Sequence, residues 1–150
     1  MNIIKVTQES FNEWLDLALK LWPHGSIEEM RASLMNIFHS PREAGFLVRD
    51  ESGKAIAFMN LSLRYEYVPD ATQSPVAYVE GIYVDDEYRH QGIGTALIRY
   101  AERWALEQGC VELASDALIE NTVSYQFHTH IGFREVERVV FFIKPLVAPD

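Results

Sequence analysis

The chain has 150 residues, of which 48% are hydrophobic and 23% are charged, the balance of an ordinary globular protein. A chain of this length can bury a core without a metal or a disulfide, so we expect one domain over residues 1–150. The formal net charge of −9 argues against nucleic acid as a partner and is compatible with a cationic small molecule. The sequence shows no signal-peptide pattern and no apolar run long enough to cross a membrane, so we expect a cytoplasmic protein with no membrane partner.

Strands and helices are expected to alternate along the chain, which predicts an α/β fold with helices on both faces of a sheet. In chain order we expect a strand at 2–6, a helix at 7–21, a helix from Ser26, strands at 44–49, 54–66 and 76–84, a helix at 94–108, a strand at 111–115, a helix at 120–131, and one or two strands at 133–144. Thr7 is predicted to cap the first helix, and Ser26 with Glu29 forms a predicted capping box. The strand at 76–84 is almost wholly apolar and is therefore expected to be buried on both faces.

The most specific local pattern is the run Arg89-His90-Gln91-Gly92-Ile93-Gly94, between an apolar strand and an amphipathic helix. Glycines there leave main-chain N–H groups unshielded, and the start of the helix adds a partial positive charge. Such a turn can bind a diphosphate without a basic patch. It lacks the Gly-Lys-Ser/Thr of a P-loop and the spacing of a dinucleotide-binding fingerprint.

Two motifs carry a resemblance to a known family. Residues 84–97, which include the turn, resemble the acetyl-CoA motif of the GNAT N-acetyltransferase superfamily, and Asn121, Ser124, His128 and Gly132-Phe133 are similar to its second signature. The resemblance implies acetyl-CoA as co-substrate and no metal. It also implies a mixed central sheet with a V-shaped opening between the strand Val76–Val84 and the strand at 111–115.

The resemblance also implies which residues hold the cofactor. Main-chain groups of Ile82, Tyr83 and Val84 would pair with the pantetheine arm, and Asn121 would touch its side. The diphosphate would lie on the turn, which comprises Arg89, His90, Gln91, Gly92, Ile93, Gly94 and Thr95. His128 stands where many relatives have a Tyr that protonates the leaving thiolate. It is either an acid or a packing residue, and Tyr125 and solvent are the other candidate acids.

Glu80 is the strongest candidate for the general base, because it is the one charged residue in an apolar strand. Gly81 beside it predicts a bulge that opens the cleft, and strand alternation predicts that Glu80 shares a face with Ile82. Asp116, at the end of the neighbouring strand, is the second candidate catalytic carboxylate. The alternatives are that Glu80 pairs with a buried arginine such as Arg64, and that Asp116 caps a turn.

A narrower resemblance follows from Leu21-Trp22-Pro23, Ser74-Pro75-Val76, Ala114-Ser115-Asp116 and Glu137-Arg138-Val139, which are similar to aminoglycoside 6′-N-acetyltransferases of chromosomal type. It implies an antibiotic-resistance enzyme, a homodimer, and substrate contacts at Trp22, Tyr67, Glu80, Asp116 and Glu137. Trp22 could instead be a core residue and Tyr67 could cover a sheet edge. Glu137 could be solvated or could reach the substrate of a partner subunit.

Two other functions fit the same residues. The first is acetylation of another amine, such as a polyamine or a protein lysine. The second is a non-catalytic module that binds acetyl-CoA. An acidic pair between aromatic walls fits a compact polycation better than a peptide.

Overall fold

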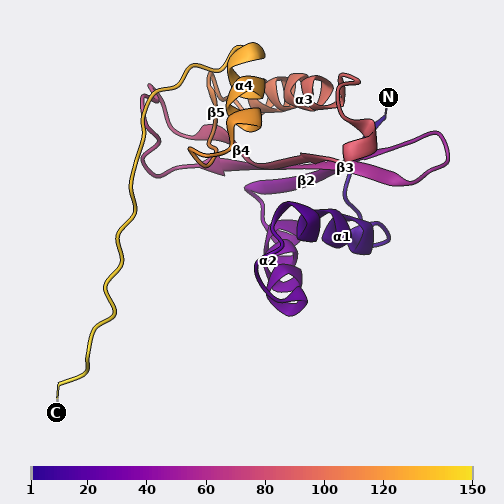
Figure 1. Ribbon diagram of the computed structural model, residues 1–150. Helices are drawn as coiled ribbons and strands as arrows, with labels where there is room; N and C mark the ends of the chain where they lie inside the picture. Colours follow the sequence, from indigo (N-terminus) through magenta and orange to yellow (C-terminus); the bar gives the residue numbers. More distant parts are fainter. Residues whose placement is uncertain (1, 150) are drawn as a thin grey trace. The chain divides into compact units, whose positions relative to one another are not determined.

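The computed structural model describes residues 2–149, which divide into two compact units, one that ends at Asp116 and one that begins at Ala117. The first unit holds a five-stranded sheet in the order β1-β2-β3-β4-β5 (Figure 1). Its strands are β1 (Ile3–Lys5), β2 (Glu43–Arg49), β3 (Ala55–Arg64), β4 (Val76–Val84) and β5 (Leu113–Ser115). Its helices are α1 (Phe11–Leu21), α2 (Ile27–His39) and α3 (Ile93–Glu107), with a short 3-10 helix, η1 (Asp86–Tyr88).

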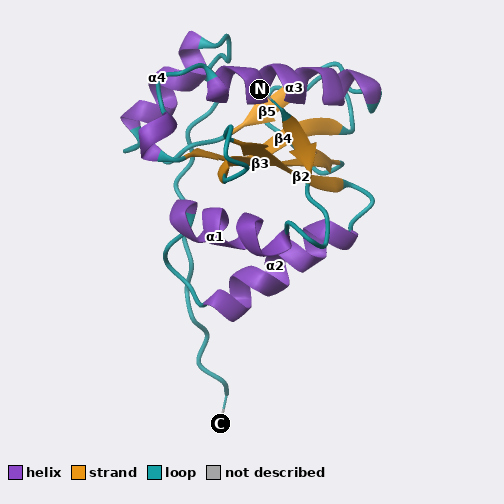
Figure 2. Cartoon of the chain, turned by 90° about the vertical axis from the view of Figure 1, so that its right-hand side faces the viewer, coloured by secondary structure: helices purple, strands orange, loops and turns teal. Residues whose placement is uncertain are grey.

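The sheet lies between α3 on one face and the α1–α2 pair on the other, as predicted (Figure 2). Successive residues of β2 face opposite sides of the sheet. A Cβ at Gly45 would lie 2.5 Å from the Trp14 ring of α1, whereas Phe46 stacks edge-on against Tyr100 of α3. On the α1 face, Asn60 of β3 accepts a hydrogen bond of 2.9 Å from the Trp14 indole, so this buried amide has a partner.

Of the two predicted N-caps, the structure confirms Ser26 and contradicts Thr7. Ser26 caps α2 by accepting a hydrogen bond of 3.0 Å from the Glu29 amide, as expected. The predicted cap at Thr7 is wrong, because α1 begins at Phe11 and Ser10 is its N-cap residue. The Ser10 hydroxyl bonds back to the Thr7 carbonyl at 3.2 Å, so these residues form a turn that precedes the helix.

β4 changes character halfway along its length. Its first four residues, from Val76 to Val79, are buried, but the rest are half-exposed, so the prediction of burial on both faces is wrong for residues 80–84. β5 pairs in parallel only with Ala77–Val79 of β4. Beyond Val79 the side of β4 that faces β5 has no β5 partner, which is the divergence expected of a V-shaped opening.

The second unit contains one helix, α4 (Thr122–His130), followed by an extended segment. The predicted strand or strands at 133–144 are absent, because the structure gives residues 133–149 no helix and no strand. The pattern there is strand-like, but a strand needs a partner for its main-chain hydrogen bonds, and a sequence pattern does not supply one. Among residues 2–149, no helix has the length and apolarity that a membrane crossing requires.

Candidate active site

Glu80 lies at an irregularity of β4. Tyr78 pairs with Ser62 and Gly81 pairs with Asn60, so Glu80 is one extra residue opposite β3. This is the bulge that Gly81 predicted. The bulge also places Glu80 on the face of Ser62 and Gly81, whereas Ile82, opposite Met59, lies on the other face. The prediction that Glu80 and Ile82 share a face is therefore wrong, since an inserted residue breaks the alternation.

Both oxygens of the Glu80 carboxylate have partners. Arg64 donates to Oε2 from Nε at 2.8 Å and to Oε1 from Nη2 at 2.7 Å, a bidentate pair. Ser62 donates its hydroxyl to Oε2 at 2.5 Å. The ion pair is only partly shielded, because the side chains of Arg64 and Glu80 are 35% and 28% exposed. The alternative expectation, a Glu80–Arg64 pair, is thus what the structure shows.

Tyr78 connects this pair to Asp116. The Arg64 guanidinium lies 3.4 Å from the centre of the Tyr78 ring, and the Tyr78 hydroxyl donates a hydrogen bond to the Asp116 carboxylate. Burial, followed by the bond to Asp116, raises the pKa of Tyr78 above its usual value. The Glu80 carboxylate raises the pKa of Arg64, so the guanidinium stays charged. We refer to Ser62, Arg64, Tyr78, Glu80 and Asp116 as the carboxylate network.

Two of these residues were missed from the sequence. Ser62 and Tyr78 carry no charge, so composition gave no reason to select them. Their positions could have indicated them. Ser62 lies two residues before Arg64 on β3, and Tyr78 lies two residues before Glu80 on β4, and side chains two residues apart in a strand share a face.

Trp22 lies beside the bulge. A Cβ at Gly81 would come within 2.4 Å of the Trp22 ring, so only glycine leaves room for it there. The ring also packs edge-on against Phe58 at 5.8 Å, yet Trp22 stays 37% exposed. It is therefore both a packing residue and an available aromatic wall. Tyr67 is 78% exposed, and the structure does not bring it into the carboxylate network.

The turn before α3 has the main-chain shape of an anion site. His90 and Gly92 have positive φ values of 61° and 85°, and Gly92 is the N-cap of α3. Because glycine has no side chain, the first amides of α3, from Ile93 to Thr95, are not capped by it. Arg89 braces the turn by donating to the Val84 carbonyl at 2.9 Å, and Gln91 donates to the Glu87 carbonyl at 3.3 Å. These amides and the left-handed residues fit a diphosphate, which is the group they were predicted to bind.

The second unit contains the other predicted cofactor residues. Asn121 is the N-cap of α4 and accepts a hydrogen bond of 3.0 Å from the Ser124 amide. His128 Nδ1 lies 2.7 Å from the Ser124 carbonyl, which can only accept, so Nδ1 carries a proton. The His128 ring also packs against Phe133 at 5.1 Å. In its neutral form this histidine has only a lone pair at Nε2, so it can act as an acid only as the imidazolium. Glu137 lies in the extended segment and is exposed.

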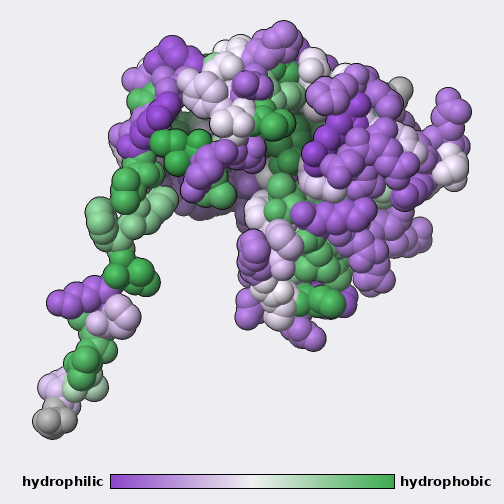
Figure 3. Space-filling view, viewed as in Figure 1, coloured by the Kyte–Doolittle hydropathy of each residue, from purple (hydrophilic) through white to green (hydrophobic). Residues whose placement is uncertain are grey.

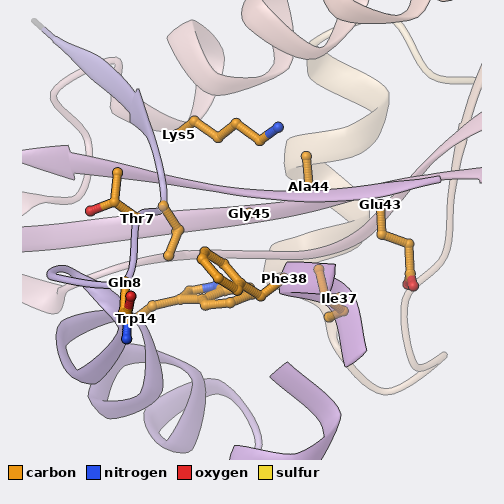
Figure 4. A pocket seen from close by; sticks show the side chains of 10 residues that line it. Lys5, Thr7, Gln8, Trp14, Ile37, Phe38, Glu43, Ala44 and Gly45 are labelled. Carbon is orange, nitrogen blue, oxygen red and sulfur yellow. The ribbon is translucent and has the colours of Figure 1, made fainter. Parts of the chain in front are cut away.

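A cavity of about 370 Å³ lies elsewhere in the first unit (Figure 4). It is lined by residues of the β1–α1 connection, the end of α2 and the start of β2, namely Lys5, Val6, Thr7, Gln8, Trp14, Ile37, Phe38, Glu43, Ala44 and Gly45. None of these residues was predicted to bind cofactor or substrate. The opening beside β4 and this cavity are therefore separate features.

Comparison with known proteins identifies the family. The sequence profile of the Acetyltransferase (GNAT) family matches residues 8–133. The chain is a GNAT acetyltransferase. A protein of Serratia marcescens named aminoglycoside N(6′)-acetyltransferase type 1 is 43% identical over 96% of this chain and 99% of its own length. A protein of the same name from Acinetobacter baumannii is 40% identical over 96% of this chain and 98% of its own.

Solved structures of GNAT proteins agree with this assignment. A 6′-N-acetyltransferase from Acinetobacter haemolyticus is 37% identical, with a TM-score of 0.91 over 98% of this chain and 100% of its own. The structure of AAC(6′)-Iy in complex with the bisubstrate analogue CoA-S-monomethyl-acetylneamine is 34% identical, with a TM-score of 0.90 over 97% of this chain and 98% of its own. The α/β GNAT fold and acetyl-CoA as co-substrate of this chain rest on these matches.

Proposed function

We propose that this GNAT enzyme transfers an acetyl group from acetyl-CoA to the 6′-amino group of aminoglycoside antibiotics, by direct transfer in a ternary complex, and so confers resistance. The observation that carries the proposal is the near-full-length similarity to proteins named aminoglycoside N(6′)-acetyltransferase and to AAC(6′)-Iy, which was solved with the bisubstrate analogue CoA-S-monomethyl-acetylneamine. Acetyl-CoA, when bound, supplies the activated acetyl group.

The amine must lose a proton before it can attack. A primary amine with a pKa of about 10.4 is roughly three units above neutral pH, so deprotonation costs about 4–5 kcal/mol. An ionised carboxylate has about four acceptor sites. Arg64 and Ser62 use three of those on Glu80, which leaves one for a water or an ammonium. We propose that Glu80 takes the proton through a bound water, with Arg64 and Ser62 fixing the carboxylate.

Main-chain donors of β4 are proposed to polarise the acetyl carbonyl. The bulge at Glu80 and the end of β5 pairing leave the β5 side of residues 80–84 without a strand partner. An N–H of Ile82 or Tyr83 in that stretch can bond to the developing oxyanion, and Val84 continues the same edge for the pantetheine arm. Arg89 through Thr95 would hold the diphosphate, with Asn121 and His128 as further cofactor contacts.

The substrate is proposed to bind through charge and flat apolar surface. Asp116 offers acceptor sites beyond the one that Tyr78 uses, and with Glu80 it can bind substrate ammonium groups. Trp22 and Tyr67 are exposed aromatic rings suited to sugar faces, and Glu137 is a further carboxylate. Cys110 is buried, and burial raises the pKa of its thiol, which supports direct transfer over an acyl-cysteine intermediate.

Three further points complete the proposal. Residues 1–150 act as one acetyltransferase domain, supported by a family match that runs across both compact units. The enzyme acts in the cytoplasm, where acetyl-CoA is made. It is a homodimer, supported by the exposed apolar side chains near the end of the chain.

A thiol-release assay tests the activity. With acetyl-CoA, we expect release of free CoA thiol with tobramycin, and much slower release with spermidine or a lysine peptide. An aminoglycoside with a hydroxyl in place of the 6′-amine is the matched control and should give background rates. Equal rates with this control and with tobramycin would contradict the 6′ assignment, and tight acetyl-CoA binding without thiol release for any amine would contradict catalysis.

A further inference from the structure

The cavity beside the start of β2 has no part in the proposed acetyl transfer, because no residue of the carboxylate network or of the turn before α3 lines it. Its volume of about 370 Å³ lies within the usual range of small-molecule sites, about 300–1,000 Å³. Hydrophobic surface is visible between hydrophilic side chains where α1 and α2 lie (Figure 3). A cavity of this size without a role is a candidate for a second ligand site.

Aromatic side chains form one wall of the cavity and are fixed in place. The buried Trp14 ring donates its indole N–H to Asn60 at 2.9 Å, and Gly45 leaves room for it, since a Cβ there would lie 2.5 Å from the ring. Phe11 packs edge-on against Trp14 at 5.6 Å and against Phe38 at 6.3 Å, so a third ring holds the two lining rings together. The wall is therefore formed before a ligand binds, which lowers the cost of binding.

The Glu43 side chain faces the same cavity. Glu43 lies two residues before Gly45 on β2, so both lie on the face of the sheet that packs against α1. Figure 4 shows the Glu43 side chain on the same side of the strand as Ile37 and Trp14. Glu43 is partly exposed, and its carboxylate has no hydrogen-bond or ion-pair partner among residues 2–149. An unpaired carboxylate beside apolar walls favours a cationic group, because a charge-assisted hydrogen bond compensates for its desolvation.

Lys5 also lines the cavity but does not neutralise Glu43. It pairs with Phe46, which packs against α3, so its side chain lies on the opposite face of the sheet. Figure 4 shows this side chain on the other side of the strands from the aromatic rings. The guanidinium of Arg42, next to Glu43 in the chain, lies 4.4 Å from the centre of the Tyr65 ring. The charge that faces the cavity is therefore negative.

We propose that this cavity is a second ligand site, which binds a small organic cation whose primary ammonium group is attached to an aromatic or branched aliphatic body. The ammonium group donates to Glu43, and the apolar body packs against Trp14 and Phe38. Glu43 repels an anion, and a neutral apolar ligand would desolvate this carboxylate without replacing its hydrogen bonds. A cation bound here is not acetylated, because the carboxylate network and the turn before α3 lie outside the cavity. The site is independent of which amine the enzyme acetylates.

Three probes of nearly the same shape measure the preference for charge. 2-Phenylethylamine carries an ammonium group, 2-phenylethanol a hydroxyl group and phenylacetate a carboxylate. In NMR titrations of the ¹⁵N-labelled full chain, we expect 2-phenylethylamine to bind at least about tenfold more tightly than either analogue, because a hydrogen bond between charged groups is the stronger kind. The amides of residues 6–8 and 43–45 should shift most. Equal affinities, no binding, or shifts confined to residues 80–84 would overturn the proposal.

Glu43→Gln keeps the shape of the side chain and removes its charge. It should weaken the binding of 2-phenylethylamine at least about tenfold and leave that of 2-phenylethanol within about twofold. Glu51→Gln is the matched control, because Glu51 is an exposed carboxylate in the β2–β3 turn, outside the cavity, and its replacement should change neither affinity by more than about twofold. Wild-type affinity for 2-phenylethylamine in the Glu43→Gln chain would show that the cation binds elsewhere.

A competition experiment separates the cavity from the acetylation site. 2-Phenylethylamine titrated into the protein with saturating CoA and tobramycin should bind with unchanged affinity, because the two sites share no residue. Loss of its binding in this mixture, or in Asp116→Asn, would place it in the carboxylate network and overturn the proposal. Thiol release with tobramycin, measured without the probe, tests the proposed acetylation by itself. Failure of that assay together with probe binding that depends on Glu43 would remove the proposed function and leave the second site.

Discussion

The carboxylate network is built from side chains, whereas the turn before α3 is built from main-chain groups. The network is made of side chains, in which Glu80 is fixed by Arg64 and Ser62 and Asp116 by Tyr78. The turn is made of main chain, in which His90 and Gly92 have positive φ values and the amides that follow are the proposed diphosphate donors. A side-chain site tolerates few changes of residue type, whereas a main-chain site tolerates most of them but not a change of backbone conformation. This difference gives opposite expectations for substitutions in the two regions.

The largest expected effect is in the network. Glu80→Gln keeps the shape of the side chain but removes the proposed base and the charge that Arg64 binds. We expect kcat/KM for tobramycin to fall at least about 100-fold, the usual contribution of a general base. The loss should grow as the pH is lowered, because less of the amine is already neutral. Thiol release between pH 6 and 9 measures it.

The matched control for this change is Glu66→Gln, since Glu66 lies just beyond β3, outside the network, and is exposed. It should change kcat/KM by less than about twofold, as expected of a surface position. A Glu80→Gln enzyme with a wild-type pH profile would remove Glu80 from the role of base.

Arg64 is the next position, as a positioning residue. Arg64→Met removes both hydrogen bonds to Glu80 and the stacking on Tyr78. We expect kcat to fall about 10- to 100-fold, the effect of a misplaced catalytic group, with no change in acetyl-CoA affinity. Arg64→Lys should recover only part of kcat, because an ammonium lacks the planar, two-pronged geometry. Full recovery by lysine would show that charge alone matters.

A smaller effect is expected in the turn. Gly92→Ala puts a Cβ on a residue at φ 85°, and although nothing lies within 4 Å of it, the backbone conformation costs about 1–2 kcal/mol. Because acetyl-CoA must restore the turn in a variant that relaxes when unliganded, affinity should fall about five- to thirtyfold, which calorimetry can measure. The neighbouring Gln91→Ala should leave affinity within about twofold, because its side chain only bonds to the Glu87 carbonyl.

Gly53→Ala is the matched control for backbone strain. Gly53 lies in the β2–β3 turn with φ 91°, and a Cβ at this position would also have nothing within 4 Å of it. Its replacement should lower the melting temperature without weakening acetyl-CoA binding. Equal losses of affinity for both alanine variants would mean that strain acts through overall stability and not through the turn.

The smallest expected effect concerns how η1, just before the turn, is anchored. Hydrogen bonds from Ser52, Tyr88 and Lys54 lower the pKa of Asp50 to about 2, and the Tyr88 bond links the β2–β3 hairpin to η1. A lowered pKa means that the stabilisation is fully present above about pH 4 and is lost as the pH falls towards 2. Asp50→Asn should therefore lower the melting temperature slightly at pH 7, with the difference from wild type vanishing near pH 2. A difference independent of pH would contradict this role.

Most of the first unit followed from local patterns. Helical spacing located α1, α2 and α3 to within a few residues, and the turn before α3 was identified from its glycines because main-chain accessibility depends on residue type alone. The bulge at Glu80 was anticipated because Gly81 interrupts an apolar strand. The sequence did not predict that Glu80 and Ile82 would lie on opposite faces of β4, because one inserted residue reverses the alternation that the prediction assumed.

The N-cap at Thr7 failed for a different reason. Thr7, like Ser10, has a hydroxyl suited to capping, and only the position of Phe11 and Trp14 against the sheet decides which residue ends the turn. The prediction of a strand at 133–144 was wrong because strand propensity depends on the segment alone, whereas a strand forms only when a second strand pairs with it.

The sequence by itself determined the family and selected the turn before α3 and Glu80 as candidate site residues, because motif spacing and an isolated charge in an apolar strand are local properties. Only the tertiary structure decided that Arg64, Ser62 and Tyr78 surround Glu80 and Asp116. These residues come from β3, β4 and the end of β5, and the register of three strands brings them together. Register depends on the packing of whole faces and on one bulge, and both are set by contacts between residues distant in the chain.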